Sequence, residues 1–410
     1  MLHKFRNKFF VTPAQIIIII IKMFMKIVGL RCRLTRSTTV TGVWNASHCN
    51  NLHSLYVNNY YTTAVSQIKT NVKSSMMMRY FTTDKVDIFN DDVMKKMLIY
   101  GMKDIRYEKT SVLKLTRLLK DLVEENKSPI SARALSRMFS ARMSSDSPEV
   151  LEMLKLMIVL SKNCNGPMSA QGVGKIMYGL NGMRSDKPEV LELLKVLTVL
   201  LKTCDEPLSS QNVVNIIYGL IGMSSDISEV LELLEVLTKL AKTCTEDLNA
   251  QAVGIMFHST QGMSSDKPEV IELLKVLTKL AKTCREDLDA HAVGNMFYGI
   301  QGMSSDNSEV IELLKVLTEL AKTCTKPLSA QEVGNMFLGL KSMSSDKPEV
   351  IELLKVLTKL AMTCREDLLP KHVGMMLLGV KGMSSDQPEM RELLKVLIKL
   401  AKTCKEDLSL

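Results

Sequence analysis

The first feature of this 410-residue chain is an absence of acid near its start. Met1 to Thr83 contain no Asp or Glu, although the same stretch holds 11 of the 53 Lys and Arg residues. The first acidic residue is Asp84, and from there on the chain contains 42 basic and 44 acidic residues. The net charge of +9 therefore belongs to the first part of the chain, and the remainder is close to neutral.

A stretch without acid that is rich in Arg, Lys, Ser and Thr is typical of an organelle transit peptide. Arg79, Tyr80 and Phe81 resemble the arginine-plus-aromatic boundary at which mitochondrial presequences are cut. We therefore predict that residues 1–83 are a transit peptide and disordered leader, which directs the protein to the mitochondrial matrix. Plastid and secretory routing are the alternatives.

Long apolar runs are also missing. Ile16 to Ile21 is a run of six isoleucines, and Lys22 follows it directly. A helix needs about 20 apolar residues to cross a bilayer. We therefore expect no stable insertion into a membrane.

Motifs for catalysis and for metal binding are missing too. After Asp84 histidine occurs only at His258, His291 and His372, and there is no phosphate-binding loop, paired-carboxylate motif or nucleophile motif. Zinc sites need paired ligands at short spacing, and no Cys-x-x-Cys pair occurs. The sequence predicts neither an enzyme nor a metal or cofactor site.

What the chain does contain is a strict repeat of 40 residues. Cysteine recurs at this spacing, and the amino-acid sequence between the cysteines repeats with it. The positions are Cys164, Cys204, Cys244, Cys284, Cys324, Cys364 and Cys404. Such a period is typical of solenoids, in which each repeat buries its apolar face against its neighbours. Equivalent residues on stacked helices lie too far apart for a disulfide, so we interpret the cysteines as small buried residues at a helix end.

Each repeat is predicted to be a helical hairpin. In residues 248–284, Asn249 is a good N-cap, and the apolar residues after it recur at spacings of three and four, which indicates an amphipathic helix. In a later repeat Ser329 and Glu332 have the spacing of a capping box. Asp266 is predicted to cap the second helix of its repeat, which carries a long apolar stripe.

Two glycine positions recur inside the first helix, although glycine costs about 1 kcal/mol relative to alanine in a helix interior. One position holds Gly174, Gly254, Gly294, Gly334 and Gly374, and the other holds Gly179, Gly219, Gly299, Gly339 and Gly379. Repetition of this cost indicates that backbones approach closely where consecutive hairpins cross.

The predicted fold is an all-α, right-handed α-solenoid of 40-residue helical hairpins. Residues 84–127 are expected to form a degenerate N-terminal capping helical pair, and residues 128–164 a degenerate first repeat. Six regular repeats follow over 165–404, and residues 405–410 read as the truncated start of a further repeat. The last hairpin is expected to expose apolar surface, so either a protein partner binds there or the sequence is a fragment.

The repeats differ most along one stripe of the first helix. The spacing i, i+4, i+7 places three residues of each repeat on one face. The triplets are Gln171-Lys175-Tyr178, Gln211-Asn215-Tyr218, Gln251-Ile255-His258, His291-Asn295-Tyr298, Gln331-Asn335-Leu338 and Lys371-Met375-Leu378. All members except Ile255, Leu338, Met375 and Leu378 are candidate RNA-binding residues.

The chemistry of the triplets suggests contact with bases. Amides hydrogen-bond to base edges, and a ring offers a stacking platform worth about 1–3 kcal/mol per base. Helical repeats that read RNA use two or three side chains per repeat in this way. Packing between hairpins is the competing explanation, because Leu338 and Leu378 take the place of the ring.

One first helix resembles a known family. Residues 288–300 read LDAHAVGNMFYGI, which is similar to the first helix of the octotricopeptide-type repeat, with Asn295 at the family's asparagine and Tyr298 at its tryptophan. The same repeat class occurs in proteins with a RAP domain, in FAST-kinase-like mitochondrial proteins and in a subunit of the RNA-editing substrate-binding complex. The resemblance covers roughly residues 128–404.

The resemblance implies an organellar RNA-binding protein that acts in mitochondrial transcript processing, stability or translation, with single-stranded organellar RNA as its partner. The near-neutral charge after residue 84 keeps a second hypothesis open, because nucleic-acid binders normally neutralise phosphates with Lys and Arg. That alternative is a protein–protein interaction scaffold of the armadillo or HEAT type, which the many methionines favour because they suit adaptable interfaces.

Overall fold

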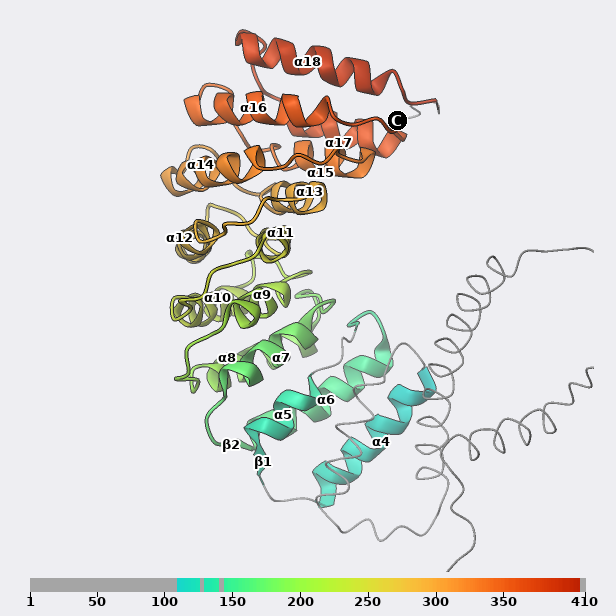
Figure 1. Cartoon of the computed structure of the whole chain (residues 1–410). Helices are drawn as coiled ribbons and strands as arrows, with labels where there is room; N and C mark the ends of the chain where they lie inside the picture. Colours follow the sequence, from blue (N-terminus) through green and yellow to red (C-terminus); the bar gives the residue numbers. More distant parts are fainter. Residues whose placement is uncertain (1–108, 126–128, 140–143, 406–410) are drawn as a thin grey trace, which may run out of the picture. The chain divides into compact units, whose positions relative to one another are not determined.

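The computed structural model describes residues 109–125, 129–139 and 144–405. These residues are all part of one compact unit, 87–410. The regular secondary structure of the described part is almost all helix, and its helices pack in the repeated pattern of an α-solenoid (Figure 1). The predicted fold class is therefore confirmed. The predicted leader, residues 1–83, lies outside the described residues.

The helices follow one another as hairpins. The N-terminal elements are α4 (Lys109–Glu125), β1 (Ile130–Ser131), α5 (Ala132–Met138), α6 (Pro148–Lys162) and β2 (Cys164–Asn165), and the two short strands pair in parallel. Six hairpins come next: α7 (Ala170–Leu180) with α8 (Pro188–Leu201), α9 (Ser210–Tyr218) with α10 (Ser228–Ala241), α11 (Ala250–His258) with α12 (Pro268–Ala281), α13 (Ala290–Gly299) with α14 (Ser308–Lys322), α15 (Ala330–Leu338) with α16 (Pro348–Ala361), and α17 (Pro370–Val380) with α18 (Pro388–Ala401).

The helices form two rows (Figure 1). The first helices of the hairpins, α5, α7, α9, α11, α13, α15 and α17, pack on one another in sequence order, and we call them the first-helix row. The helices α4, α6, α8, α10, α12, α14, α16 and α18 pack in the same way and form the second-helix row. Each repeat is thus stabilised by its neighbours in the stack, as expected for a solenoid.

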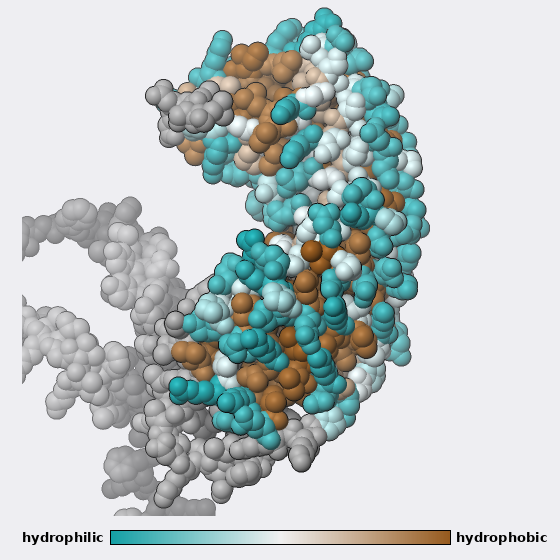
Figure 2. Space-filling model, turned by 180° about the vertical axis from the view of Figure 1, so that it is seen from behind, coloured by the Kyte–Doolittle hydropathy of each residue, from teal (hydrophilic) through white to brown (hydrophobic). Residues whose placement is uncertain are grey.

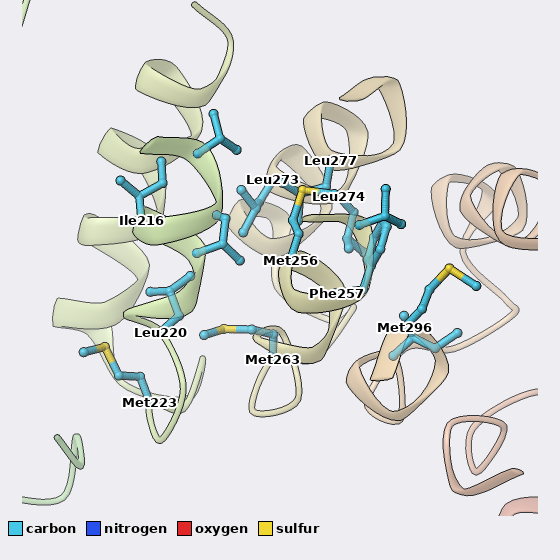
Figure 3. Packing of buried hydrophobic residues seen from close by; sticks show 14 of the residues in the cluster. Ile216, Leu220, Met223, Met256, Phe257, Met263, Leu273, Leu274, Leu277 and Met296 are labelled. Carbon is cyan, nitrogen blue, oxygen red and sulfur yellow. The ribbon is translucent and has the colours of Figure 1, made fainter. Parts of the chain in front are cut away.

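The core lies between consecutive hairpins. Figure 3 shows Ile216 of α9, Met256 and Phe257 of α11 and Met296 of α13 along one continuous layer of apolar side chains. The second helix α12 adds Leu273 and two further leucines to this layer, all of them fully buried. Because leucine recurs here at spacings of one, three and four, one face of each second helix is removed from water along its whole length.

The first helices begin where the sequence predicts. The side chain of Asn249 accepts a hydrogen bond from the backbone N–H of Ala252. Ser329 and Glu332 form the predicted capping box, in which each side chain accepts a hydrogen bond from the other residue's backbone N–H. Polar N-caps therefore fix the start of these helices by satisfying N–H groups that have no partner inside the helix.

The second helices begin differently, and the prediction that Asp266 caps α12 is wrong. The helix starts at Pro268, after Lys267 at the N-cap position. Proline suits this first position because its fixed φ is helical and its missing N–H would have no partner there. Asp266 instead lies in the preceding turn, where a hydrogen bond from Ser264 lowers the pKa of its carboxyl group.

The recurrent glycines lie where first helices cross. A Cβ atom added to Gly254 would lie 2.8 Å from the Cα of Ala292 in the next first helix. A Cβ atom added to Gly299 would overlap the carbonyl group of Phe257 in the preceding first helix. The first glycine position therefore faces the following repeat and the second faces the preceding repeat, which confirms the predicted close approach.

Replacing Gly254 with alanine is expected to lower the free energy of unfolding by about 1–3 kcal/mol, because the added methyl group pushes two packed backbones apart. Gly374 is the matched control, since it holds the same position in α17 and an added Cβ there meets no atom within 4 Å. Its replacement with alanine is expected to raise stability by up to about 1 kcal/mol. Urea unfolding followed by circular dichroism measures both changes, and equal effects at the two positions would contradict the role of Gly254.

Candidate nucleic-acid interface

The candidate residues lie on the exposed side of the first-helix row. The first member of each triplet is exposed; these residues are Gln171, Gln211, Gln251, His291, Gln331 and Lys371. The second and third members that are candidates are partly buried; these are Lys175, Tyr178, Asn215, Tyr218, His258, Asn295, Tyr298 and Asn335. Six consecutive first helices thus present the same side, with the exposed member near the start of each helix.

In three triplets the first two members contact each other within one helix. The side-chain amide of Gln211 donates to Oδ1 of Asn215 at 3.1 Å, and that of Gln331 donates to the equivalent atom of Asn335 at 2.8 Å. The amide nitrogen of Asn295 lies 3.0 Å from Nε2 of His291. These contacts hold each pair of polar groups in a defined orientation at the surface, which reduces the conformational entropy lost when a ligand binds.

The rings at the third position stack in pairs between repeats. The ring centroids of Tyr178 and Tyr218 are 5.5 Å apart with an interplanar angle of 24°. Those of His258 and Tyr298 are 5.4 Å apart with an angle of 23°. Packing between hairpins therefore accounts for one side of each ring, because each ring contacts the equivalent ring of a neighbouring repeat. The rings also remain partly exposed.

Charge is divided unequally between the two rows. Among the described first helices, α5 to α17, Glu332 is the only acidic residue, and its carboxylate is held in the capping box. Lys175 and Lys371 lie in the same row. The second-helix row holds Glu and Lys together and pairs them between consecutive repeats, as with Lys315 and Glu349 at 3.6 Å. The near-neutral total thus conceals a first-helix row that is almost free of acid.

A hollow of about 530 Å³ lies at the start of α13 and α15, next to the stripe. His291, Lys326 and Arg365 contribute its basic groups, and its acidic groups are Asp289, Glu332 and Glu366. All three acids are engaged in hydrogen bonds to backbone N–H groups at the starts of α13 and α15. Acidic and basic groups therefore share this hollow, and Nδ1 of His291 lies 3.9 Å from Oε1 of Glu332.

Lys326 departs from its equivalents in the other repeats. In four of the described repeats this position holds a glutamate whose carboxylate accepts the N–H of the first residue of the preceding first helix at 2.7–3.0 Å. The pairs are Glu206 with Ala170, Glu246 with Ser210, Glu286 with Ala250 and Glu366 with Ala330. Lysine cannot accept this hydrogen bond. The start of α13 therefore has a cation where its sister helices have a carboxylate.

His258 takes the place that tyrosine holds in three other repeats. Burial lowers the pKa of its ring, and the charge of nearby His291 lowers it further. Its Nδ1 is buried, and the described residues offer it no hydrogen-bond partner. The ring is therefore uncharged near neutral pH, as suits an aromatic surface that stacks on Tyr298.

Two features of this surface were not foreseen from the sequence. His372 is buried at 5 % exposure, accepts the N–H of Leu369 and reaches Gln331 of the preceding repeat at 3.3 Å. The burial of His372 was not indicated by the sequence, because no other repeat has a histidine at the equivalent position. Lys326 did have a signal, since alignment of the repeats shows glutamate in the equivalent place.

Comparison with protein-family models and with curated proteins finds no match to this chain. Within the residues that the structure describes, no cluster of His, Cys, Asp and Glu is arranged to hold a metal ion. The described helices also include none that is long and apolar enough to span a membrane. The class of the protein, a helical-repeat α-solenoid, is thus defined by its own architecture.

Acid is expected to destabilise the fold through His258. Its pKa in the folded chain is below the unfolded value of about 6.5, so the neutral ring contributes stability above that pH, and this contribution is lost as the pH falls. His258→Tyr, which copies Tyr298, removes this dependence. The urea midpoints at about pH 7.5 and about pH 5.5 should therefore differ less for the variant than for the wild type.

The variant is expected to keep some pH dependence, because burial also lowers the pKa of His372. An equal fall in midpoint for His258→Tyr and for the wild type would contradict the assignment to His258.

Proposed function

We propose that this protein binds single-stranded RNA along its first-helix row and acts without catalysis. One observation carries the proposal: the five consecutive first helices α7 to α15 present amides, the first four of them also present rings, and among the described first helices Glu332 is the single acidic residue. Phosphates approach such a row with little repulsion, whereas the second-helix row pairs its charges internally.

The mode of binding follows from the triplets. The exposed member and its hydrogen-bonded partner offer donors and acceptors to the edge of a base, as Gln331 and Asn335 do. A half-exposed ring such as Tyr298 offers an aromatic edge and part of a face to the same base. Lys326 and Arg365 offer positive charge to the phosphates beside His291. One repeat would thus contact about one nucleotide.

We further propose that the RNA is organellar and that the protein acts in the processing, stability or translation of mitochondrial transcripts. Two observations from the sequence support this: the acid-free stretch that precedes Asp84 and the resemblance of residues 288–300 to octotricopeptide-type repeats. Localisation of the tagged full chain by microscopy tests the first of these independently of RNA binding.

Replacing Asn295 and Tyr298 is expected to weaken RNA binding by about 5- to 100-fold, the loss of one stacked and hydrogen-bonded base. Asn295→Met and Tyr298→Leu copy Met375 and Leu378 of a sister repeat, so the helix should form as before. Titration of the full chain with fluorescent single-stranded RNA at several salt concentrations measures the change.

Lys279→Ala is the control for that titration, because Lys279 is exposed on α12 in the second-helix row. It should leave affinity nearly unchanged. An equal loss in the control and in the double variant, or binding without salt dependence, would contradict the proposal.

Lys326→Glu is expected to weaken RNA binding without loss of stability, because it restores the carboxylate that caps the sister helices. Removal of one phosphate contact should reduce the slope of log K against log salt by about 0.7. The reciprocal change, Glu286→Lys, should increase the slope, since it adds a second cation, at the start of α11. Unchanged slopes for both variants would show that these positions do not meet phosphate.

A protein-binding scaffold is the alternative, and one observation favours it. Large apolar side chains are exposed in the last hairpin, with Leu377 at 57 %, Leu378 at 49 % and Ile398 at 56 %. Figure 2 shows hydrophobic residues gathered at this end of the stack. This function predicts that polypeptides co-purify with the wild type after ribonuclease treatment and are lost when Leu377 and Ile398 are replaced by glutamine.

A further inference from the structure

One junction of the stack departs from the repeat pattern on both rows. It lies between the α9–α10 hairpin and the α11–α12 hairpin, and we call it the central junction. On the first-helix row, glycine at the first recurrent position faces the next helix and glycine at the second faces the preceding one. Both are missing at the central junction alone, because α9 has Val214 at the first position and Ser259 follows α11 at the second.

Side chains at these two positions prevent the usual approach of backbones. At the other junctions an added Cβ at the second position would overlap a carbonyl group of the preceding helix, as Gly299 does with Phe257. Ser259 has a real Cβ there, and its hydroxyl donates to the carbonyl of Ile255 at 2.7 Å. Accordingly α9 and α11 make the least extensive contact of any two consecutive first helices that the structure describes.

The second-helix row loses an ion pair at the same place. At five junctions a lysine of one second helix pairs with a glutamate of the next at 3.1–3.8 Å; the pairs are Lys155–Glu189, Lys195–Glu229, Lys275–Glu309, Lys315–Glu349 and Lys355–Glu389. At the central junction the lysine is replaced by Glu235, opposite Glu269. Two like charges therefore meet where the other junctions have an attraction.

The loss of the lysine leaves Glu269 without its usual partner. Its Oε2 is buried and has no hydrogen-bond partner among the described residues. A hollow of about 310 Å³, lined by both glutamates and by Thr238, opens between α10 and α12. The polar contacts that remain include exposed ion pairs such as Lys242–Glu272 at 3.9 Å, which contribute little, and a hydrogen bond from the N–H of Ser264 to Ser225. The apolar layer of Figure 3 continues across the junction.

We propose that the central junction is a hinge, at which residues 144–244 and residues 245–405 move as two blocks. Stability in a solenoid is a sum of repeat and junction terms, so a junction that loses close packing on the first-helix row and an ion pair on the second-helix row is where the stack opens first. One stacked ring pair of the stripe lies in each block, Tyr178 with Tyr218 and His258 with Tyr298. Opening the hinge changes the spacing between these two halves of the stripe.

The cysteines are built-in reporters of each junction. Cys204, Cys244 and Cys284 lie just after the second helices of three consecutive repeats and are similarly buried, at 7–9 % exposure. Burial raises the pKa of all three thiols. Each of them lies in the connection from a second helix to the next first helix, and Cys244 lies between α10 and α11. Cys244 therefore reports on the central junction.

Pulsed labelling of the native full chain with N-ethylmaleimide, read at each cysteine by peptide mass spectrometry, tests the hinge. Cys244 is expected to react about fivefold faster than Cys204 and Cys284. Glu235→Lys should slow Cys244 toward its neighbours and leave their rates unchanged. The reciprocal variant Lys275→Glu, which removes the ion pair of the next junction, should instead speed Cys284.

Equal rates at the three cysteines of the wild type would overturn the hinge. So would a fast Cys244 that is slowed neither by Glu235→Lys nor by its combination with Val214→Gly and Ser259→Gly. Circular dichroism of each variant confirms that it is folded before labelling.

Discussion

The close approach of consecutive first helices is the constraint on which the rest of this structure depends. It is possible only because a glycine such as Gly299 lets one helix rest on the carbonyl group of Phe257 in the preceding one. This contact fixes the step from repeat to repeat, and the same step brings sister rings to 5.4–5.5 Å and joins lysine to glutamate across the second-helix row. Where the glycines are replaced, the ion pair is missing as well, so both rows depart from the pattern at one place.

The regular step also explains how a repeat region of nearly neutral charge presents one row of helices that is almost free of acid. Repetition assigns every residue of one repeat position to the same row, so a composition difference between the two helices becomes a difference between two faces of the stack. The second helices contain glutamate and lysine in positions where they pair, whereas the first helices contain almost no acid. The triplets are then displayed in register, with Gln331 and Asn335 bound to each other at the surface.

Much of the fold was predictable from the sequence, because it depends on local signals that recur. The caps at Asn249 and Ser329 and the meaning of the glycines follow from a single repeat. The start of the second helices was mispredicted, because Asp266 and Pro268 are both helix-start signals and the proline determines the first position. The contact of His372 with Gln331 and the coincidence of departures at the central junction were out of reach, since both require knowing which neighbour a given side of the helix faces.

The central claim is that the first-helix row is the surface that meets RNA. Ultraviolet cross-linking of the full chain to single-stranded RNA, followed by identification of the cross-linked peptides, tests it most directly. The account predicts cross-links in peptides from α7 to α17, with Tyr178, Tyr218 and Tyr298 among the modified residues. Cross-links confined to the second helices, or to residues before Asp84, would contradict it.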